Sequence, residues 1–250
     1  MTQEEYIKYI QGLMKKEPVT ITSKVKVKGF NSKNIKSIPI IINSYNRLSC
    51  LKELVDRLKS MDYNNIYIID NNSTYEPLLN YYENENLNVF RMNKNVGFLS
   101  IWKTDIFKNF ISNPYVYTDP DVIPIEQCPD NFIEHFYNLL KKYPEVDKVG
   151  FGLKLDDIPE IFKMKNEVIG HESQFWVNQI ETNVYAAPVD TTFALYRPGK
   201  IGGFWMRGLR TGGDYLARHM GWYLDTNNPT EEDIFYKNSI TQLTHWSVKD

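Results

Sequence analysis

The sequence predicts an α/β fold in which a mostly parallel central sheet carries helices on both faces. Short apolar segments rich in β-branched and aromatic residues alternate with segments whose apolar residues recur at helical spacing. The apolar segments are nearly continuous, which is typical of parallel strands buried on both faces. Polar residues follow the ends of these segments, and the carboxyl edge of such a sheet is where ligands bind.

Length and charge limit the kinds of protein that the chain can be. Its 250 residues, 42% of them hydrophobic, are enough for one large core, so we expect a single domain over residues 1–250. The net charge is -2 and the basic residues are scattered. We therefore expect no nucleic acid as a partner.

Cysteine content and hydropathy bear on the compartment. Cys50 and Cys128 are the only cysteines and form no CxxC, so the sequence favours a reducing, cytoplasmic compartment and no zinc site built on cysteine. It contains no apolar run of about eighteen residues and no signal-peptide pattern. We therefore expect no transmembrane segment.

The N-terminal segment predicts a helix followed by an extension. Thr2 and Glu5 form a capping box, and apolar residues follow at helical spacing as far as Lys16. Packing on the protein's own domain is the simpler interpretation. Peripheral contact with a membrane surface or a partner is the alternative. Residues 17–37 are rich in lysine and carry only weak strand signals.

Strands and helices then alternate through the first half of the chain. Each expected strand is a run of β-branched or aromatic residues that ends in polar ones, and each expected helix has apolar residues on one face. The expected strands are 38–42, 66–69, 88–92 and 115–118, and the expected helices are 48–58, 77–82 and 98–110.

The second half continues the alternation with weaker signals. Asp130 predicts the N-cap of a helix, residues 147–153 predict a fifth strand, and residues 190–197 predict a strand that opens on an acid. Glycines between residues 202 and 213 predict a flexible loop that could close over a ligand. Thr230 predicts the N-cap of a last helix, with three acids in its first turn.

The chemistry of the chain centres on Asp119-Pro120-Asp121, directly after the fourth strand. Residues i and i+2 of an extended chain point to the same side, about 6–7 Å apart. At an effective dielectric constant of about 20, two negative charges at that distance repel by roughly 2–3 kcal/mol. Such a pair therefore favours a bound cation or a shared proton, and for a cation the oxygen ligands suit Mg²⁺ or Mn²⁺.

Two common phosphate-binding motifs are absent. No GxGxxG follows the first strand, and no GxxxxGK[ST] occurs in the sequence. The strand ends present Asn, Ser, Tyr, Arg and Asp instead. Such groups can bind a base and ribose while a metal ion on Asp119 and Asp121 binds a diphosphate.

Four segments in a fixed order carry a family resemblance. They read IPIIINSYNR at 38–47, IIDNNST at 68–74, NKNVGF at 93–98 and TDPDV at 118–122. This series resembles the nucleotide-sugar glycosyltransferases of the GT-A fold, closest to their family 2-like members. The resemblance implies a Rossmann-like GT-A sheet, with a nucleotide-sugar-binding half at residues 38–125 and an acceptor-binding, catalytic half at residues 150–250.

The resemblance also implies the residues of a donor site. Asp119 and Asp121 would be the DXD motif that holds Mn²⁺ or Mg²⁺ with the diphosphate. Asp70 is followed by Asn71, where many relatives have a second acid, so the base of the nucleotide stays open. The residues implied around the nucleotide sugar are Asn43, Tyr45, Asn46, Arg47, Asp70, Asn72, Asn95, Gly97 and Asp119.

The second half would then supply the catalytic base and complete the metal site. Inverting relatives draw the base from a Glu-Asp pair, which implies Glu232 or Asp233, with Asp190 as a further candidate. Some relatives add a histidine near the C-terminus to the metal ligands. His219 and His245 are the two histidines in question, and His245 is the expected ligand.

The resemblance implies transfer of a sugar from a nucleoside diphosphate sugar, with a UDP-sugar as the expected donor, to a hydroxyl of a growing glycan or glycoconjugate. A phosphatase of the haloacid dehalogenase class is one alternative, with Asp119 as nucleophile and Asp121 as acid–base. That class carries its motif on the first core strand, whereas three strand–helix units come first here. A binding protein without turnover is the other alternative.

Overall fold

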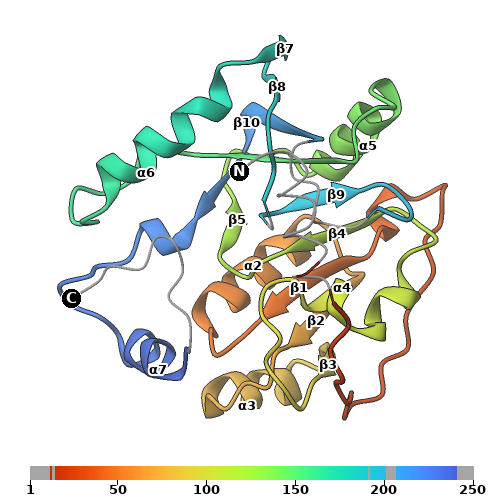
Figure 1. The fold of residues 1–250 in the computed structure, drawn as a ribbon, viewed down its shortest axis with the longest axis vertical. Coiled ribbons are helices and arrows are strands. Elements are labelled where there is room, and N and C mark those ends of the chain that lie inside the picture. The colour runs from red at the N-terminus through yellow and green to blue at the C-terminus, as the bar shows by residue number, and fades with distance from the viewer. Residues whose placement is uncertain (1–11, 13–14, 191, 201–206, 241–250) are drawn as a thin grey trace.

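The structure, a computed structural model, describes residues 12, 15–190, 192–200 and 207–240 (Figure 1). The strands are β1 (Ile40–Ser44), β2 (Ile66–Asp70), β3 (Asn88–Arg91), β4 (Tyr115–Thr118), β5 (Val122–Pro124), β6 (Lys148–Leu153), β7 (Gln179–Glu181), β8 (Val184–Ala186), β9 (Ala194–Tyr196) and β10 (Gly208–His219). The α-helices are α2 (Ser49–Ser60), α3 (Glu76–Asn84), α4 (Ser100–Lys103), α5 (Phe132–Lys142), α6 (Lys165–Glu172) and α7 (Glu231–Ser239). The 3-10 helices are η1 (Ile35–Ser37), η2 (Asp105–Asn109), η3 (Ser173–Trp176) and η4 (Met220–Trp222).

One sheet takes strands from both halves of the described chain. Its order is β3-β2-β1-β4-β9-β6-β10-β8-β7, with β5 paired to β10. The strands from β3 to β4 are parallel, as are β6 and β10, and β9 runs antiparallel between β4 and β6. The predicted fold class, a mostly parallel α/β sheet, is confirmed, and it agrees with the sheet that the GT-A resemblance implied.

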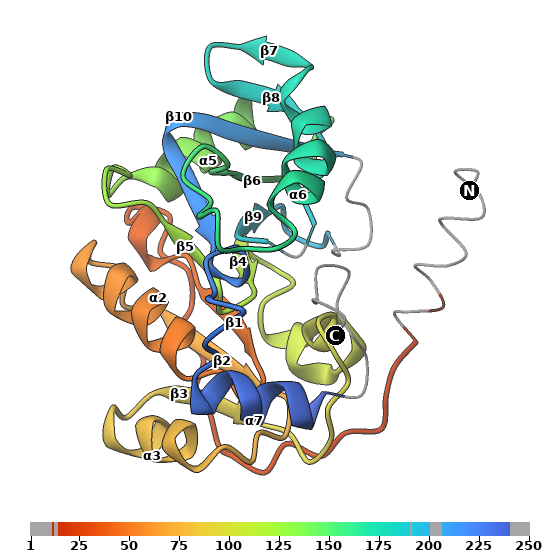
Figure 2. The same cartoon turned by 90° about the vertical axis from the view of Figure 1, so that its left-hand side faces the viewer.

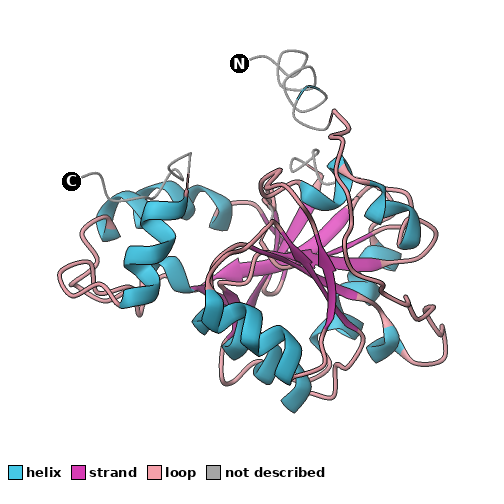
Figure 3. Cartoon of the chain, turned by 90° about the horizontal axis from the view of Figure 1, so that it is seen from below, coloured by secondary structure: helices cyan, strands magenta, loops and turns pink. Residues whose placement is uncertain are grey.

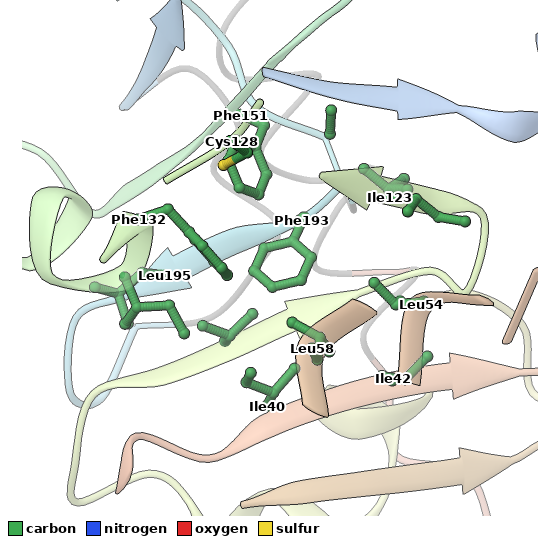
Figure 4. Packing of buried hydrophobic residues seen from close by; sticks show 14 of the residues in the cluster. Ile40, Ile42, Leu54, Leu58, Ile123, Cys128, Phe132, Phe151, Phe193 and Leu195 are labelled. Atoms are coloured by element: carbon green, nitrogen blue, oxygen red, sulfur yellow. The ribbon is translucent and has the colours of Figure 1, made fainter. Parts of the chain in front are cut away.

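Alternate residues of β1 belong to two separate cores, one on each face of the sheet. Ile40 and Ile42 pack with α2, α5 and the Phe132–Phe151–Phe193 cluster of rings (Figure 4). Ile41 faces the other side, among residues of α4 and η2. Helices accordingly lie on both sides of the strands (Figure 3). Burial on both faces explains why the strands read as continuous apolar runs.

The predicted helix over residues 98–110 is wrong in its length. The chain forms α4 and η2 instead, and Thr104 between them is extended, with φ −121° and ψ 170°. The carbonyl of Lys103 accepts a hydrogen bond from the Glu17 N–H, and that of Thr104 accepts one from Lys16 Nζ. The extension at residues 15–17 therefore takes acceptors that a continuous helix would have used.

The predicted flexible loop is wrong for its described part, because residues 208–213 lie in β10. A Cβ on Gly212 would lie 3.2 Å from Trp176 and from Tyr185, so this glycine admits close packing. Gly213 has a φ of +64°, which suits the irregularity in the pairing of β10 with β6. Residues 201–206 lie outside the described residues.

The two predicted N-caps have different outcomes. Asp130 does not cap α5: its N-cap residue is Asn131, and the Asp130 carboxylate pairs with Lys36 at 3.2 Å. Thr230 caps α7 as predicted, in a capping box with Asp233. The predicted strand at residues 190–197 forms only as the shorter β9.

Several elements of the second half carried no clear sequence signal. These are α6, η3 and the β7–β8 hairpin, which projects at one end of the molecule in Figure 2. The predicted helix over residues 2–16 lies almost wholly outside the described residues. None of the helices in the described part of the chain has the length and apolar character needed to span a bilayer.

Candidate active site

Asp119 and Asp121 follow β4 at the carboxyl edge of the parallel strands. Pro120 separates them and β5 begins at the next position, so the chain turns at this edge. Both acids are half-buried. Because β1 and β4 pair in register, Asn43 lies beside Asp119, with its Nδ2 3.4 Å from Asp119 Oδ1. The edge predicted for ligand binding thus carries both acids.

His219, at the end of β10, lies beside Asp121. Its Nε2 is 3.9 Å from Asp121 Oδ2, and the Met220 N–H donates to the Asp121 carbonyl at 2.7 Å. The imidazole stacks on the buried indole of Trp222 at a centroid distance of 4.8 Å. Its Nδ1 is buried and has no hydrogen-bond partner among the described residues. The ring is therefore held by packing, with Nε2 toward the acid.

The chemistry of this donor set fits a divalent cation. Ligand bonds of about 2.0–2.2 Å place two atoms bound to one ion at most roughly 4.4 Å apart, a limit that His219 Nε2 and Asp121 Oδ2 meet. Among the described residues, no group of three or more His, Cys, Asp or Glu could by itself hold a metal ion. Water molecules or substrate phosphates would supply the remaining ligands of such a site. His245, the expected ligand, lies outside the described residues.

Asp70 is fully buried at the end of β2 and is bound by protein groups. Tyr82 Oη donates to its Oδ1 at 3.1 Å, and the Ser73 N–H and Arg91 Nε lie 3.1 Å from its Oδ2. Burial raises the pKa of the carboxyl, and the Ser73 hydrogen bond and the Arg91 charge oppose that shift. Asp70 therefore joins the β2 loop to α3 and β3.

Asn46 and Asn72 shape the loops after β1 and β2. Both adopt the left-handed conformation, with φ of 49° and 63°, which Asn tolerates better than most residues. Asn46 is buried, and its Oδ1 accepts the N–H groups of Thr74 and Tyr75 at 2.8 and 3.0 Å. It ties the two loops together, whereas the side chain of Asn72 is exposed.

The segment at residues 93–98 forms a turn near the same edge. Gly97 has a φ of +83°, and its N–H donates to Asn95 Oδ1 at 2.9 Å. The Val96 N–H donates to Asn71 Oδ1 at 3.1 Å, so the turn is fastened to the β2 loop. Asn95, Gly97 and Phe98 are exposed.

Helix α7 lies over the loop that follows β1 (Figure 2). Arg47 Nη1 donates to Asp233 Oδ1 at 2.7 Å, and its guanidinium stacks on Tyr236 at 4.2 Å from the ring centroid. Tyr45 Oη donates to the Ser239 carbonyl at 2.8 Å. Burial and the nearby Asp121 and Asp119 carboxylates raise the pKa of Tyr236, while the Arg47 charge opposes that shift. The two carboxylates after β4 therefore act electrostatically on the Tyr236 hydroxyl of α7.

Glu232 and Asp233, the predicted bases, are both engaged with protein groups. Glu232 is buried and accepts hydrogen bonds from the N–H and the hydroxyl of Ser49. Asp233 closes the capping box with Thr230 and binds Arg47. The arrangement of both acids explains how α7 is held on the domain.

Asp190 is exposed, in the segment that leads to β9. The buried Lys148 lies 3.4 Å from its carbonyl oxygen and 3.5 Å from Tyr196 Oη. Burial raises the pKa of Tyr196, and the Asp190 and Asp119 carboxylates raise it further. Both acids therefore act electrostatically on the same buried hydroxyl.

Three residues at this edge were not among the predicted site residues. Asn71 and Ser100 bind the Asn43 side chain, and Tyr236 stacks on Arg47. Asn71 lies inside one of the four family-like segments, so a signal for it existed. The sequence indicated the nearby Glu232 and Asp233 but not Tyr236, because the position of its ring depends on how α7 docks.

Comparison with known proteins gives only distant structural similarities. No protein-family model matches the sequence, and the search of curated proteins finds no match. The fold is similar to glucosyl-3-phosphoglycerate synthase from Mycobacterium tuberculosis in complex with phosphoglyceric acid, at 10% identity and a TM-score of 0.39, over 70% of this chain and 64% of that one. A structure of the same synthase with Mn²⁺ and UDP-glucose matches at 12% identity and a TM-score of 0.38, over the same shares.

A cytidylyltransferase from Leptospira borgpetersenii matches at 12% identity and a TM-score of 0.32, over 55% of this chain and 71% of that one. The match spans 64% of the length of each synthase chain. At these identities and TM-scores, the similarities carry no argument about activity.

Proposed function

We propose that the protein is a metal-dependent glycosyltransferase that moves a sugar from a nucleoside diphosphate sugar, with UDP as the expected nucleotide, to a hydroxyl of a glycan or other acceptor. The observation that carries the proposal is the grouping of Asp119, Asp121 and His219 at the carboxyl edge of the parallel strands, the edge at which the loop after β1 carries Arg47. Two acids, an imidazole and a guanidinium at one edge suit a metal-bound diphosphate.

Residues from three parts of the chain would bind the metal ion and the diphosphate. Asp119, Asp121 and His219 would hold Mn²⁺ or Mg²⁺, which when bound offsets the charge of the departing diphosphate. Arg47 is oriented by Asp233 and Tyr236 and would donate to a phosphate oxygen or to the nucleotide.

Exposed polar groups of the neighbouring loops would surround the nucleoside. Asn72 and Asn95 are exposed, and the positive φ of Gly97 lets the backbone approach a ligand closely. Tyr45 would lie at the same end, between the β1 loop and α7.

The acceptor hydroxyl needs a proton acceptor if the reaction inverts the anomeric centre. We assign this role to Asp190, with Glu232 and Asp233 as alternatives, because the side chain of Asp190 is exposed whereas Glu232 is buried against Ser49. If the reaction retains configuration, Asp190 would only position a sugar.

A thermal-shift panel of nucleoside diphosphates and their sugars, with and without Mn²⁺, tests the proposal. A nucleotide at 100 times its Kd should stabilise the protein by roughly 2.7 kcal/mol. The stabilisation should increase when Mn²⁺ is present, and this increase should disappear in Asp119→Ala and in Asp121→Ala. Asp156→Ala removes an exposed acid as the matched control and should respond as the wild type does.

The wild-type response separates the proposal from its alternatives. If no nucleotide stabilises the protein, the glycosyltransferase proposal fails, and hydrolysis of p-nitrophenyl phosphate then tests the phosphatase hypothesis. If a nucleotide sugar binds, release of free sugar or UDP with a panel of acceptors distinguishes an enzyme from a protein that only binds the ligand.

A further inference from the structure

We infer that Asn43 positions the Asp119 carboxylate for metal binding and does not contact the nucleotide. The inference rests on the proposed function, since it assigns a task to a residue beside the proposed metal site. It changes the role that the family resemblance implied for Asn43, from a ligand contact to a support of the DXD motif.

Hydrogen bonding leaves the Asn43 amide only one orientation. Its Oδ1 lies 2.6 Å from Asn71 Nδ2 and 2.6 Å from Ser100 Oγ, and both groups donate to it. Asn71 presents its Nδ2 to Asn43 because its own Oδ1 accepts the Val96 N–H at 3.1 Å. The Nδ2 of Asn43 is therefore directed at Asp119 Oδ1, 3.4 Å away.

Burial excludes most of this network from a ligand. Asn43 is 8% exposed, Asn71 is 1% exposed and Ser100 is fully buried. Of the residues in this network, only Asp119 is half-buried, so its carboxylate is the group that a ligand can contact. The network joins the ends of β1, β2 and β4 to residues 93–98. These fixed elements therefore hold the Asp119 carboxylate in one orientation.

Such support has a measurable value for a metal site. A carboxylate that is already oriented loses less rotational freedom when it binds an ion, and removing a partner of a metal ligand costs roughly 10–100-fold in affinity. A residue that instead contacts the nucleotide would alter nucleotide affinity whether or not metal is present. The two roles therefore differ in which ligand they affect.

The experiment measures two affinities separately, Mn²⁺ alone by calorimetry and UDP alone in the presence of EDTA. Asn43→Ala should raise the Kd for Mn²⁺ about tenfold and leave the Kd for UDP without metal unchanged. Ser100→Ala removes one donor to Asn43 at a position that no ligand can reach, and it should raise the Kd for Mn²⁺ by a smaller factor. Asn84→Ala, on the exposed end of α3, is the matched control and should change neither affinity.

Each outcome decides the inference. If Asn43→Ala and Ser100→Ala are folded by circular dichroism and bind Mn²⁺ with the same Kd as the wild type, the inference is wrong. The proposed metal site is then unaffected. A loss of UDP affinity without metal in Asn43→Ala assigns that residue to the nucleotide instead. If the wild type binds no Mn²⁺, the proposed metal site and the inference fall together.

Discussion

The Glu232 carboxylate lies at the first turn of α2, where it accepts hydrogen bonds from the Ser49 N–H at 3.0 Å and the Ser49 hydroxyl at 3.0 Å. The N-cap residue of α2, Leu48, makes no side-chain capping hydrogen bond. An acid from the last described helix therefore caps a helix that begins 183 residues earlier in the sequence. This contact holds α7 over the loop that follows β1.

Removing this cap should destabilise the protein. Glu232→Ala leaves the N–H and the hydroxyl of Ser49 without their acceptor, and we expect a loss of about 1–2 kcal/mol, since caps have that value. For a chain of this length the loss lowers Tm by a few degrees. Glu231→Ala, at the exposed neighbouring position, is the control in the same thermal unfolding series. Equal Tm values for both variants would show that the contact contributes nothing.

Arg47 and Asp233 should be energetically coupled. Their side chains are each 18% exposed and lie 2.7 Å apart, so the pair is partly shielded from solvent. A double-mutant cycle with Arg47→Met and Asp233→Asn should give a coupling free energy of roughly 1.5–3 kcal/mol, the value of a hydrogen bond to a charged group. Urea unfolding of the four proteins measures it. A coupling within error of zero would make the pair irrelevant to the docking of α7.

Lys148 should make stability depend on pH. Burial lowers its pKa to about 7, from 10.5, so between these values the unfolded state binds a proton that the folded state lacks. The free energy of unfolding should therefore rise with pH between about 7 and 10.5. Below this range both states are protonated, and the buried charge lowers the free energy of unfolding by its full amount.

Lys148→Met removes this cost. The variant should exceed the wild type in Tm most at about pH 6, and its advantage should shrink toward pH 10. Lys163→Met makes the same substitution at an exposed position and should show no such trend. An advantage of Lys148→Met that stays constant from pH 6 to pH 10 would contradict the assigned pKa.

His219 should contribute to metal affinity if the proposed site is correct. Its Nε2 lies 3.9 Å from Asp121 Oδ2, and loss of one ligand should weaken Mn²⁺ binding at least tenfold. Calorimetry on His219→Ala measures the change. His171→Ala, at an exposed position of α6, is the control. Unchanged Mn²⁺ affinity in His219→Ala would exclude the imidazole from the site.

The strands of the first half could be located from the sequence because their burial on both faces makes them continuous apolar runs. The same reasoning predicted that polar residues would meet at one sheet edge, and Asn43 does lie beside Asp119 there. Strand β10 was not predicted from the sequence, because its glycines, which include Gly212 packed against Trp176, are typical of a loop. The helix predicted over residues 98–110 was too long, because residues 15–17 bind backbone carbonyls at the end of α4.

The sequence by itself determined the alternation of strands and helices, the acids after β4 and the cap of α7, since each depends on neighbouring residues or on local hydrophobic pattern. Only the tertiary structure decided which side chains share the site. His219 reaches Asp121 through the pairing of β10 with β5, and Glu232 is drawn to Ser49 by the docking of α7. Those contacts join residues distant in the chain, and local pattern carries no information about which distant partner a polar group will find.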